Sequence, residues 1–218
     1  MIPMSIVQRT KEYFLKKMKL RSIKKYGVEA LSLIHEAGKT TGRYVWLEYG
    51  TLLGAYRDHG FIAHDDDIDL CMYATDFDHI FMRALYDRGF KIIRKFTIVD
   101  AAHPEKQSVT EVTLKFHMVY IDIFLRFRDV EKSYNILWAK VDPIRNLWKA
   151  NRDYFDFPGF DEIDFLGIRF LVPTNAKEYL EAKYGLDFMT PQPNWHPAPK
   201  VYLSIEECYG EVMGGWIG

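Results

Sequence analysis

The stretch EYGTLLGAYRDHGFIAHDDDIDL, residues 48–70, contains the two features that decide the fold. Residues 44–49 are rich in aromatic and β-branched side chains, which predicts a strand, and Gly50 and Thr51 end it in a turn. The apolar run 68–73 predicts a second strand. It is entered through four closely spaced aspartates: Asp65, Asp66, Asp67 and Asp69.

Two of these aspartates should project from the same face of the second strand. Side chains alternate along a strand, so Asp67 and Asp69 share one face while Ile68 and Leu70 point into the core. Two adjacent carboxylates repel each other unless a cation lies between them or one carboxylate is protonated. Carboxylate oxygens suit Mg²⁺, so the pair predicts a magnesium site.

The acidic run has two other interpretations, a calcium-binding loop and a solvated surface loop. A calcium loop requires glycine where the chain has Leu70, and glutamate where it has Asp76. Most acidic runs are solvated surface loops, but the apolar residues around this one drive it toward the core. The metal site is therefore the favoured interpretation.

A third carboxylate occurs in MVYIDIFLRF, residues 118–127. Asp122 interrupts an apolar strand, where an unpaired carboxylate is expensive to bury, so we expect it to face a cation. An ion pair with Lys115 or Arg126 is the structural alternative. Three acids on adjacent strands would hold one or two Mg²⁺ ions for phosphoryl transfer.

The turn at Gly50 and Thr51 is then predicted to bind the phosphate group of a ligand. A strand that runs through a glycine turn into a helix exposes backbone N–H groups to an anion, and Thr51 adds a hydroxyl donor. Gly54 permits close approach of a ligand or of another backbone segment. Arg57 lies one helical turn further on, where its guanidinium is placed to bind phosphate oxygens.

These motifs resemble the LicD proteins, relatives of fukutin in the nucleotidyltransferase-fold superfamily. The block 48–70 is similar to the family signature, in which G-T-L-L-G leads through an arginine to D-D-D-I-D-L. YIDIFL at 120–125 is similar to the later family strand, and YLEAKYGLDFMTP at 179–191 to the closing helix. The likeness spans roughly residues 28–191 and rests mainly on the first block.

The resemblance implies an α+β fold, a nucleotidyltransferase-like mixed β-sheet flanked by helices. It also implies a Mg²⁺-dependent phosphotransferase that moves phosphocholine from a cytidine-linked donor, CDP-choline, to a sugar hydroxyl of a cell-surface glycan and releases CMP. In that reaction Gly50 and Thr51 would hold nucleotide phosphates. Asp67 and Asp69 would bind metal, and Asp122 would complete the catalytic site as ligand or base.

Several alternatives stay open. The same metal chemistry is compatible with transfer of phosphoethanolamine, an alditol phosphate or a phosphonate in place of phosphocholine. A nucleotidyltransferase that releases pyrophosphate uses the same motifs, and a non-catalytic nucleotide- or glycan-binding module would keep the fold. The chain has Ile62-Ala63-His64 where the family commonly has Ile-Pro-Trp. His64 is either a new proton carrier or a partner of the acidic loop, and Asp65 also falls on an acidic position of the family.

Composition limits the setting. With 218 residues and 48% hydrophobic content the chain is long enough for one domain over 1–218, and a net charge of −1 disfavours general nucleic-acid binding. Cys71 and Cys208 have no metal-ligand spacing and cannot form a disulfide framework. No signal-like or membrane-spanning run occurs, so we expect a cytoplasmic protein.

The N-terminal segment 1–27 is predicted to be a basic helix. Its apolar residues Phe14, Leu15, Met18 and Ile23 recur at helical spacing, so the favoured interpretation is a helix packed by this stripe with a solvated basic face. The alternative is peripheral contact with the inner face of a membrane or with an anionic partner.

The rest of the chain gives a sequence of expected elements. Helices are predicted over 28–37, 76–88 and 133–148, the last interrupted by Pro143, and strands over 90–98, 109–116, 119–127, 160–165 and 168–172. Asn175 and Glu178 predict a capping box for a final helix that ends before Gly185. Residues 191–218 are expected to form a tail.

Overall fold

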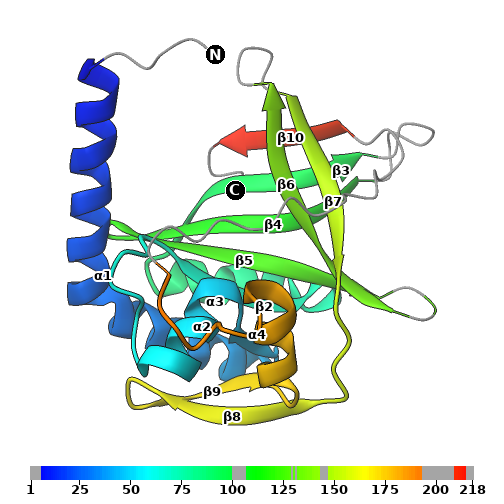
Figure 1. Ribbon diagram of the computed structural model, residues 1–218. Helices are drawn as coiled ribbons and strands as arrows, with labels where there is room; N and C mark the ends of the chain where they lie inside the picture. Colours follow the sequence, from blue (N-terminus) through cyan, green and yellow to red (C-terminus); the bar gives the residue numbers. More distant parts are fainter. Residues whose placement is uncertain are drawn as a thin grey trace.

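The structure is a computed structural model that describes residues 6–99, 107–128, 130, 132–142, 147–192 and 209–214. Its centre is a mixed β-sheet with the strand order β10-β3-β4-β5-β2-β1-β9-β8, and a β6–β7 hairpin extends from β5. Helices pack around this sheet (Figure 1). The predicted α+β fold class is confirmed.

The helices and strands have the following bounds. They are α1 (Ile6–Thr41), β1 (Val45–Leu47), α2 (Tyr49–Leu53), a π-helical turn (Gly54–Asp58), β2 (Ile68–Tyr73), a 3₁₀ turn (Ala74–Asp76), α3 (His79–Asp87), β3 (Lys91–Val99), β4 (Gln107–Phe116), β5 (Val119–Arg128), β6 (Ser133–Asp142), β7 (Leu147–Tyr154), β8 (Phe160–Phe165), β9 (Ile168–Pro173), α4 (Ala176–Tyr184) and β10 (Tyr209–Gly214). The strands predicted over 90–98, 109–116, 119–127, 160–165 and 168–172 are confirmed as β3, β4, β5, β8 and β9, with ends that differ by at most two residues.

The middle of the sheet fixes the positions of the acidic residues. Strand β2 runs parallel to β5 with Asp69 opposite Asp122, and antiparallel to β1. The residues flanking Asp69, Ile68 and Leu70, are completely buried, as is Trp46 of β1. Because adjacent strand residues point to opposite faces, burial of Ile68 and Leu70 on one face directs Asp69 to the other.

The first helix is longer than the sequence predicted. Two helices, over 1–27 and 28–37, were expected, but α1 runs without a break from Ile6 to Thr41. Gly27 does not end a helix, because it marks a close approach: a Cβ at this position would lie 2.8 Å from the ring of Phe61. The helix ends at Gly42, whose φ of +69° suits glycine.

The N-terminal half of α1 rises beside the sheet instead of packing along its whole length (Figure 1). Side chains 9–18 are all exposed, including the predicted packing residues Phe14 at 57% and Met18 at 48%. Of the expected apolar stripe, Ile23 reaches the core, at 3% exposed. The prediction that Phe14, Leu15 and Met18 pack against the protein was therefore wrong.

The prediction of a helix over 133–148 was also wrong. Residues 133–142 form β6 and residues 147–154 form β7, and the two strands pair in antiparallel fashion. Residues 143–146, with the predicted interruption at Pro143, lie outside the described residues. The hairpin contacts β4 and β10 (Figure 1). Long-range polar contacts account for the strand: Asn135 receives a hydrogen bond from Arg126 and donates one to Glu48, 87 residues away. Tertiary context overrides local pattern in such a segment.

Two further predictions need correction near the C-terminus. Asn175 does precede α4, but its side chain caps no helix N–H and donates instead to the Asp156 carbonyl at 3.2 Å, so the capping box does not form. The segment 191–218 is more than a tail, because β10 pairs with β3 along its full length. Most of the proline-rich part, from residue 193 on, lies outside the described residues.

Glu48 joins several elements directly beneath the start of α2. Its carboxylate is 1% exposed and accepts hydrogen bonds from Trp46 Nε1 at 3.0 Å, from Asn135 Nδ2 at 3.2 Å and from the Tyr179 hydroxyl. Burial raises the pKa of Glu48, and the Tyr179 hydrogen bond opposes that rise. One side chain therefore ties β1 to β6 and α4.

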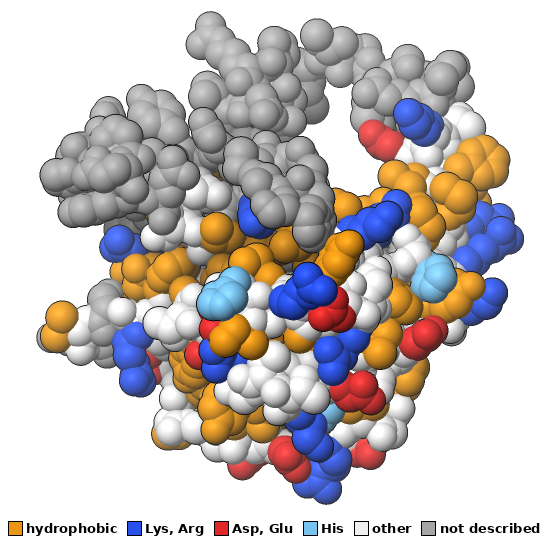
Figure 2. All heavy atoms as spheres, turned by 180° about the vertical axis from the view of Figure 1, so that it is seen from behind, with side chains coloured by type: hydrophobic (Ala, Val, Ile, Leu, Met, Phe, Trp, Pro, Cys, Tyr) orange, Lys and Arg blue, Asp and Glu red, His pale blue; other side chains and the backbone are white. Residues whose placement is uncertain are grey.

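The surface carries both signs of charge. On the face shown in Figure 2, Lys and Arg side chains are interspersed with Asp and Glu among the residues drawn in colour. This distribution agrees with the net charge of −1. Among the helices that the structure describes, none combines the length and apolar character required to cross a bilayer.

We predict that Glu48→Ala costs about 3–5 kcal/mol of unfolding free energy, because it leaves buried donors without their acceptor. Glu48→Gln should cost less, since it keeps the size and one acceptor oxygen. Urea denaturation measures both losses. The exposed Glu29→Ala on α1 is the control and should change stability by less than about 0.5 kcal/mol; an equally small loss in Glu48→Ala would refute this role for Glu48.

Candidate active site

The junction of β1 and α2 holds one end of the acidic strand. Gly50 and Thr51 lie in the first turn of α2, which begins at Tyr49, so the predicted turn is already part of the helix. The Gly50 N–H donates to Asp69 Oδ2 at 3.0 Å, and the Thr51 hydroxyl accepts from the Asp69 N–H at 2.8 Å. This helix start therefore fixes both the backbone and the carboxylate of Asp69.

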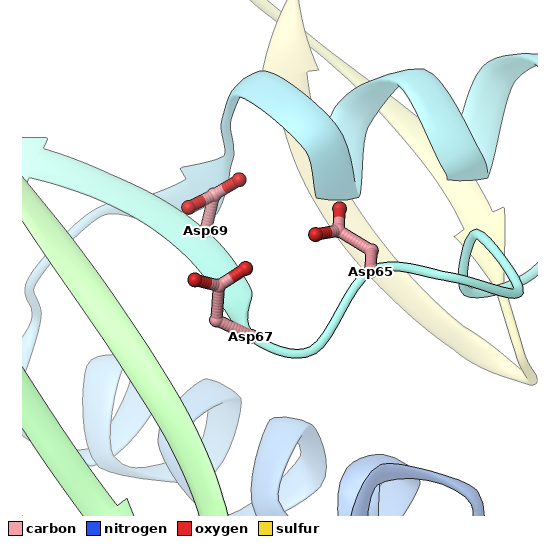
Figure 3. A group of neighbouring side chains, drawn as sticks. All are labelled: Asp65, Asp67 and Asp69. Atoms are coloured by element: carbon pink, nitrogen blue, oxygen red, sulfur yellow. The ribbon is translucent and has the colours of Figure 1, made fainter. Parts of the chain in front are cut away.

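Three aspartates converge beside this junction. Asp65, Asp67 and Asp69 each offer a carboxylate oxygen within 4.8 Å of the others. Figure 3 shows their carboxylates close together, those of Asp65 and Asp67 from the segment that leads into β2 and that of Asp69 from β2 itself. The sequence singled out Asp67 and Asp69, and the structure adds Asp65. Asp66 turns away and forms an ion pair with Lys19 at 3.0 Å.

The electrostatics of the three aspartates are unfavourable without a cation. Burial, followed by the charges of Asp65 and Asp122, raises the pKa of Asp67 to about 7. Burial and the neighbouring carboxylates raise the pKa of Asp69 well above its usual range, and burial raises that of Asp65. Oxygen ligands at this spacing suit a divalent cation, which would favour the ionised forms.

Asp122 lies next to the three aspartates, opposite Asp69 on β5. It is not one of the three whose oxygens converge, although its charge acts on Asp67 and Asp69. Its partners are the Thr113 hydroxyl and Arg94, whose Nη2 lies 3.4 Å from Asp122 Oδ1. The predicted alternative, an ion pair of Asp122 with Lys115 or Arg126, was therefore wrong, because the cation that pairs with Asp122 is Arg94.

A cavity of about 310 Å³ opens beside the aspartates. Asp65, Asp69 and Gly50 form one wall, and the remaining lining includes the rings of Tyr49, Tyr184 and Phe188 together with Leu53, Arg57, Ile62, His64, Thr190 and Gln192. Burial and the charges of Asp69 and Asp65 raise the pKa of Tyr184. The cavity thus joins aromatic surface to an acidic metal-binding edge.

The other predicted substrate-binding residues take different positions. Arg57 lines the cavity, and its guanidinium pairs with Asp58 through Nε at 2.7 Å and Nη2 at 2.8 Å. His64 also lines it. Thr51 is 4% exposed and lies under the cavity, not in its lining. Its observed contact is with the backbone of Asp69, not with the ligand space.

Sequence reasoning missed two residues near Asp122. Arg94 on β3 and Glu111 on β4 form an ion pair at 3.5 Å. Burial and the charge of Asp122 raise the pKa of Glu111 to about 8. The one signal in the sequence was a charged residue inside each apolar strand, and without the strand register that signal gives no position in the fold.

A sequence model of the family described as "LicD/FKTN/FKRP, nucleotidyltransferase domain" matches residues 42–175. The chain belongs to the LicD/FKTN/FKRP family. This match covers the strand, turn and acidic run of residues 44–70 and the strand of Asp122, so the family resemblance seen in the sequence is confirmed.

The chain is also similar to curated proteins from animals and from a bacterium. The uncharacterized protein T07A5.1 of Caenorhabditis elegans is 30% identical over 74% of this chain and 42% of its own length. The mouse ribitol-5-phosphate transferase FKTN is 28% identical over 79% of this chain and 35% of its own. The uncharacterized protein RP689 of Rickettsia prowazekii is 31% identical over 61% of this chain and 58% of its own.

The chain therefore spans between about a third and three fifths of the length of these relatives. Among solved structures, the chain is similar to the lincomycin-bound lincosamide antibiotic adenylyltransferase LnuA. The identity is 17% and the TM-score 0.42, over 70% of this chain and 83% of that one.

We predict that Gly50→Ala impairs metal binding without unfolding the protein. A Cβ at this position would overlap Asp65 Oδ2 and lie 3.1 Å from Asp69 Oδ2, so the carboxylates must move apart. Overpacking of this kind costs about 1–3 kcal/mol, or roughly ten- to hundredfold in Mn²⁺ affinity by titration calorimetry. The control is Gly159→Ala, whose Cβ has 3.9 Å of space; equal Mn²⁺ affinity in both variants would contradict the account.

We also predict that the metal-free protein loses stability as pH rises from 5 to 8. The folded-state pKa values of Asp67, about 7, and Glu111, about 8, lie above the unfolded values near 4. Their stabilisation is complete below pH 4 and is lost as pH rises through 7 and 8. The pKa values of Asp58 and Asp78 are lowered by arginines, so these groups titrate below this window.

Urea unfolding in EDTA at pH 5, 6, 7 and 8 measures this dependence. Mg²⁺ should restore part of the stability at pH 8, because it favours the ionised carboxylates, and Asp67→Asn should flatten the pH profile. Stability in EDTA that is constant or rises between pH 5 and 8 would contradict the prediction.

Proposed function

We propose that this chain is a divalent-metal-dependent transferase that moves a phospho-substituent from a CDP-linked donor to a sugar hydroxyl. The observation that carries the proposal is the position of Asp65, Asp67 and Asp69 at the edge of a cavity that also contains Arg57 and aromatic rings. A metal edge beside an aromatic cavity suits a nucleotide diphosphate, whose base is apolar on its faces and whose phosphates bind cations.

The donor's nucleoside is proposed to enter the cavity beside Tyr184 and Phe188, with its phosphates toward Arg57 and the aspartates. Asp65, Asp67 and Asp69 would hold the metal, and Gly50 leaves the space that their carboxylates need. A bound Mg²⁺ would neutralise charge on the diphosphate during transfer. Two hydrogen bonds keep that strand end in place: the Gly50 N–H donates to the Asp69 carboxylate, and the Asp69 N–H donates to the Thr51 hydroxyl.

Asp122 is proposed to accept the proton of the attacking hydroxyl. The hydroxyl oxygen forms a bond to the phosphorus of the transferred group, the bond from that phosphorus to the CMP oxygen breaks, and CMP leaves with the electron pair. The strand register supports this role, because Asp122 lies opposite Asp69 and would be near the phosphorus of a donor held at the aspartates.

Two transferred groups are proposed for testing. Phosphocholine follows from the family resemblance, and the rings of Tyr49, Tyr184 and Phe188 offer faces to a quaternary ammonium. Relatives named ribitol-5-phosphate transferase favour an alditol phosphate as the second candidate. Both groups leave the same product, CMP, so one assay serves for both.

We propose that the protein lies at the cytoplasmic side of a membrane that carries the acceptor. Support comes from the exposed half of α1, where Lys11, Lys16 and Lys17 accompany Tyr13 and Phe14. A vesicle-sedimentation assay with anionic and neutral lipids measures this contact.

We predict that Asp69→Asn lowers CMP release by roughly a hundredfold or more while the fold is kept, because it removes a metal ligand. Asp66→Asn is the matched control from the same acidic run, since Asp66 pairs with Lys19 outside the cluster. It should retain wild-type turnover.

CMP release is measured by chromatography in the presence of Mg²⁺, and circular dichroism confirms folding. Substantial turnover by a folded Asp69→Asn variant would refute the assignment. Pyrophosphate release from a nucleoside triphosphate, in place of CMP, would instead identify a nucleotidyltransferase.

A further inference from the structure

Three strands place a row of polar side chains beside Asp69. Asp69 on β2 is opposite Asp122 on β5, Asp122 is opposite Thr113 on β4, and Thr113 is opposite Arg94 on β3. Residues opposite each other in a sheet project from the same face. The acidic edge of the site therefore continues across the sheet and ends in a cation.

Both contacts that this row makes with Asp122 meet the same carboxylate oxygen. The Thr113 hydroxyl donates to Asp122 Oδ1, and Arg94 Nη2 lies 3.4 Å from that same oxygen. Arg94 Nε also donates to the Thr113 hydroxyl at 2.9 Å. Arg94 thus holds Asp122 both directly and through Thr113, and neither contact uses Oδ2.

Arg94 is itself held in place before any ligand binds. Its Nη2 lies 3.5 Å from Glu111, which is 7% exposed, and its guanidinium stacks 4.7 Å from the centre of the Phe96 ring. The Arg94 side chain still keeps 37% of its surface accessible. A planar guanidinium fixed by several partners loses little freedom when it orients a carboxylate.

Arg94 lies on the opposite side of the aspartates from the cavity. The cavity is bounded by Gly50 and Asp69, on the β2–β1 side of Asp122, whereas Arg94 lies on the other side of Asp122, on β3. Phosphoryl transfer requires the attacking and leaving oxygens to be roughly in line. If CMP occupies the cavity, the acceptor hydroxyl approaches from the side of Asp122 and Arg94.

We propose that Arg94 is a positioning residue for the transfer, an inference that rests on the proposed function. It fixes Asp122 through Oδ1, so that Oδ2 is presented to the acceptor hydroxyl. Glu111 and Phe96 keep the guanidinium in the position that this requires. The β3–β4 side of the site is accordingly the acceptor side, and the cavity is the donor side.

The kinetic test compares Arg94→Gln, Arg94→Lys and the control Lys95→Gln, with water as acceptor and CMP release as readout. Lys95 follows Arg94 on β3 and, by strand alternation, points to the other face. Arg94→Gln should lower kcat by roughly ten- to hundredfold, with the donor KM within about threefold of wild type. Arg94→Lys should recover part of kcat, and Lys95→Gln should match wild type.

Opposite results overturn the proposal. A raised donor KM with unchanged kcat would make Arg94 a donor-binding residue, and unchanged kinetics would give it no part in the reaction. If the kcat of Arg94→Lys is no higher than that of Arg94→Gln, the reaction does not require a cation beside Asp122.

Mn²⁺ titration calorimetry gives a second readout that needs no turnover. Removing a cation beside Asp122 should tighten Mn²⁺ binding by roughly three- to tenfold, whereas loss of a merely structural residue should weaken it. A wild-type protein that consumes no CDP-linked donor overturns the proposed function. If folded Arg94→Gln binds Mn²⁺ no more tightly than Lys95→Gln does, Arg94 does not act on Asp122 as proposed.

Discussion

The organisation of this site depends on the repulsion among half-buried carboxylates at the start of β2. Asp65, Asp67 and Asp69 lie close enough to share one ion, and burial raises the pKa of each. Such an arrangement opposes folding at neutral pH unless other contacts hold it. The proposed metal binding and the predicted instability of the metal-free site therefore have the same physical origin.

Two sets of contacts keep these carboxylates together. On one side, Glu48 anchors the start of α2, which places the Gly50 N–H on Asp69. On the other side, Arg94 and Thr113 hold Asp122. Both sets are preorganised polar networks built on strands and a helix start, which position functional groups more closely than loops do. The three aspartates thus lie between a cavity and a sheet surface that carries the Arg94 cation.

The sequence predicted the part of this arrangement that depends on local pattern. Alternation around Ile68 and Leu70 placed Asp67 and Asp69 on one face, and Asp122 stood out inside an apolar strand. Arg94 could not be found in this way, because its place depends on the register of three strands. The helix prediction for residues 133–148 was wrong for a similar reason: the Asn135 side chain donates to Glu48, 87 residues away, and no local window of sequence contains that contact. Gly27 looked like a helix end, but the ring of Phe61 requires it inside α1.

We propose that the three aspartates hold a divalent ion that serves a CDP-linked donor. The most direct test measures CMP release from CDP-choline and CDP-ribitol, in MgCl₂ and in EDTA, alongside pyrophosphate release from nucleoside triphosphates. We expect CMP from at least one CDP-linked donor in MgCl₂, none in EDTA, and no pyrophosphate. CMP release that persists in EDTA, or pyrophosphate as the product, would contradict the proposal.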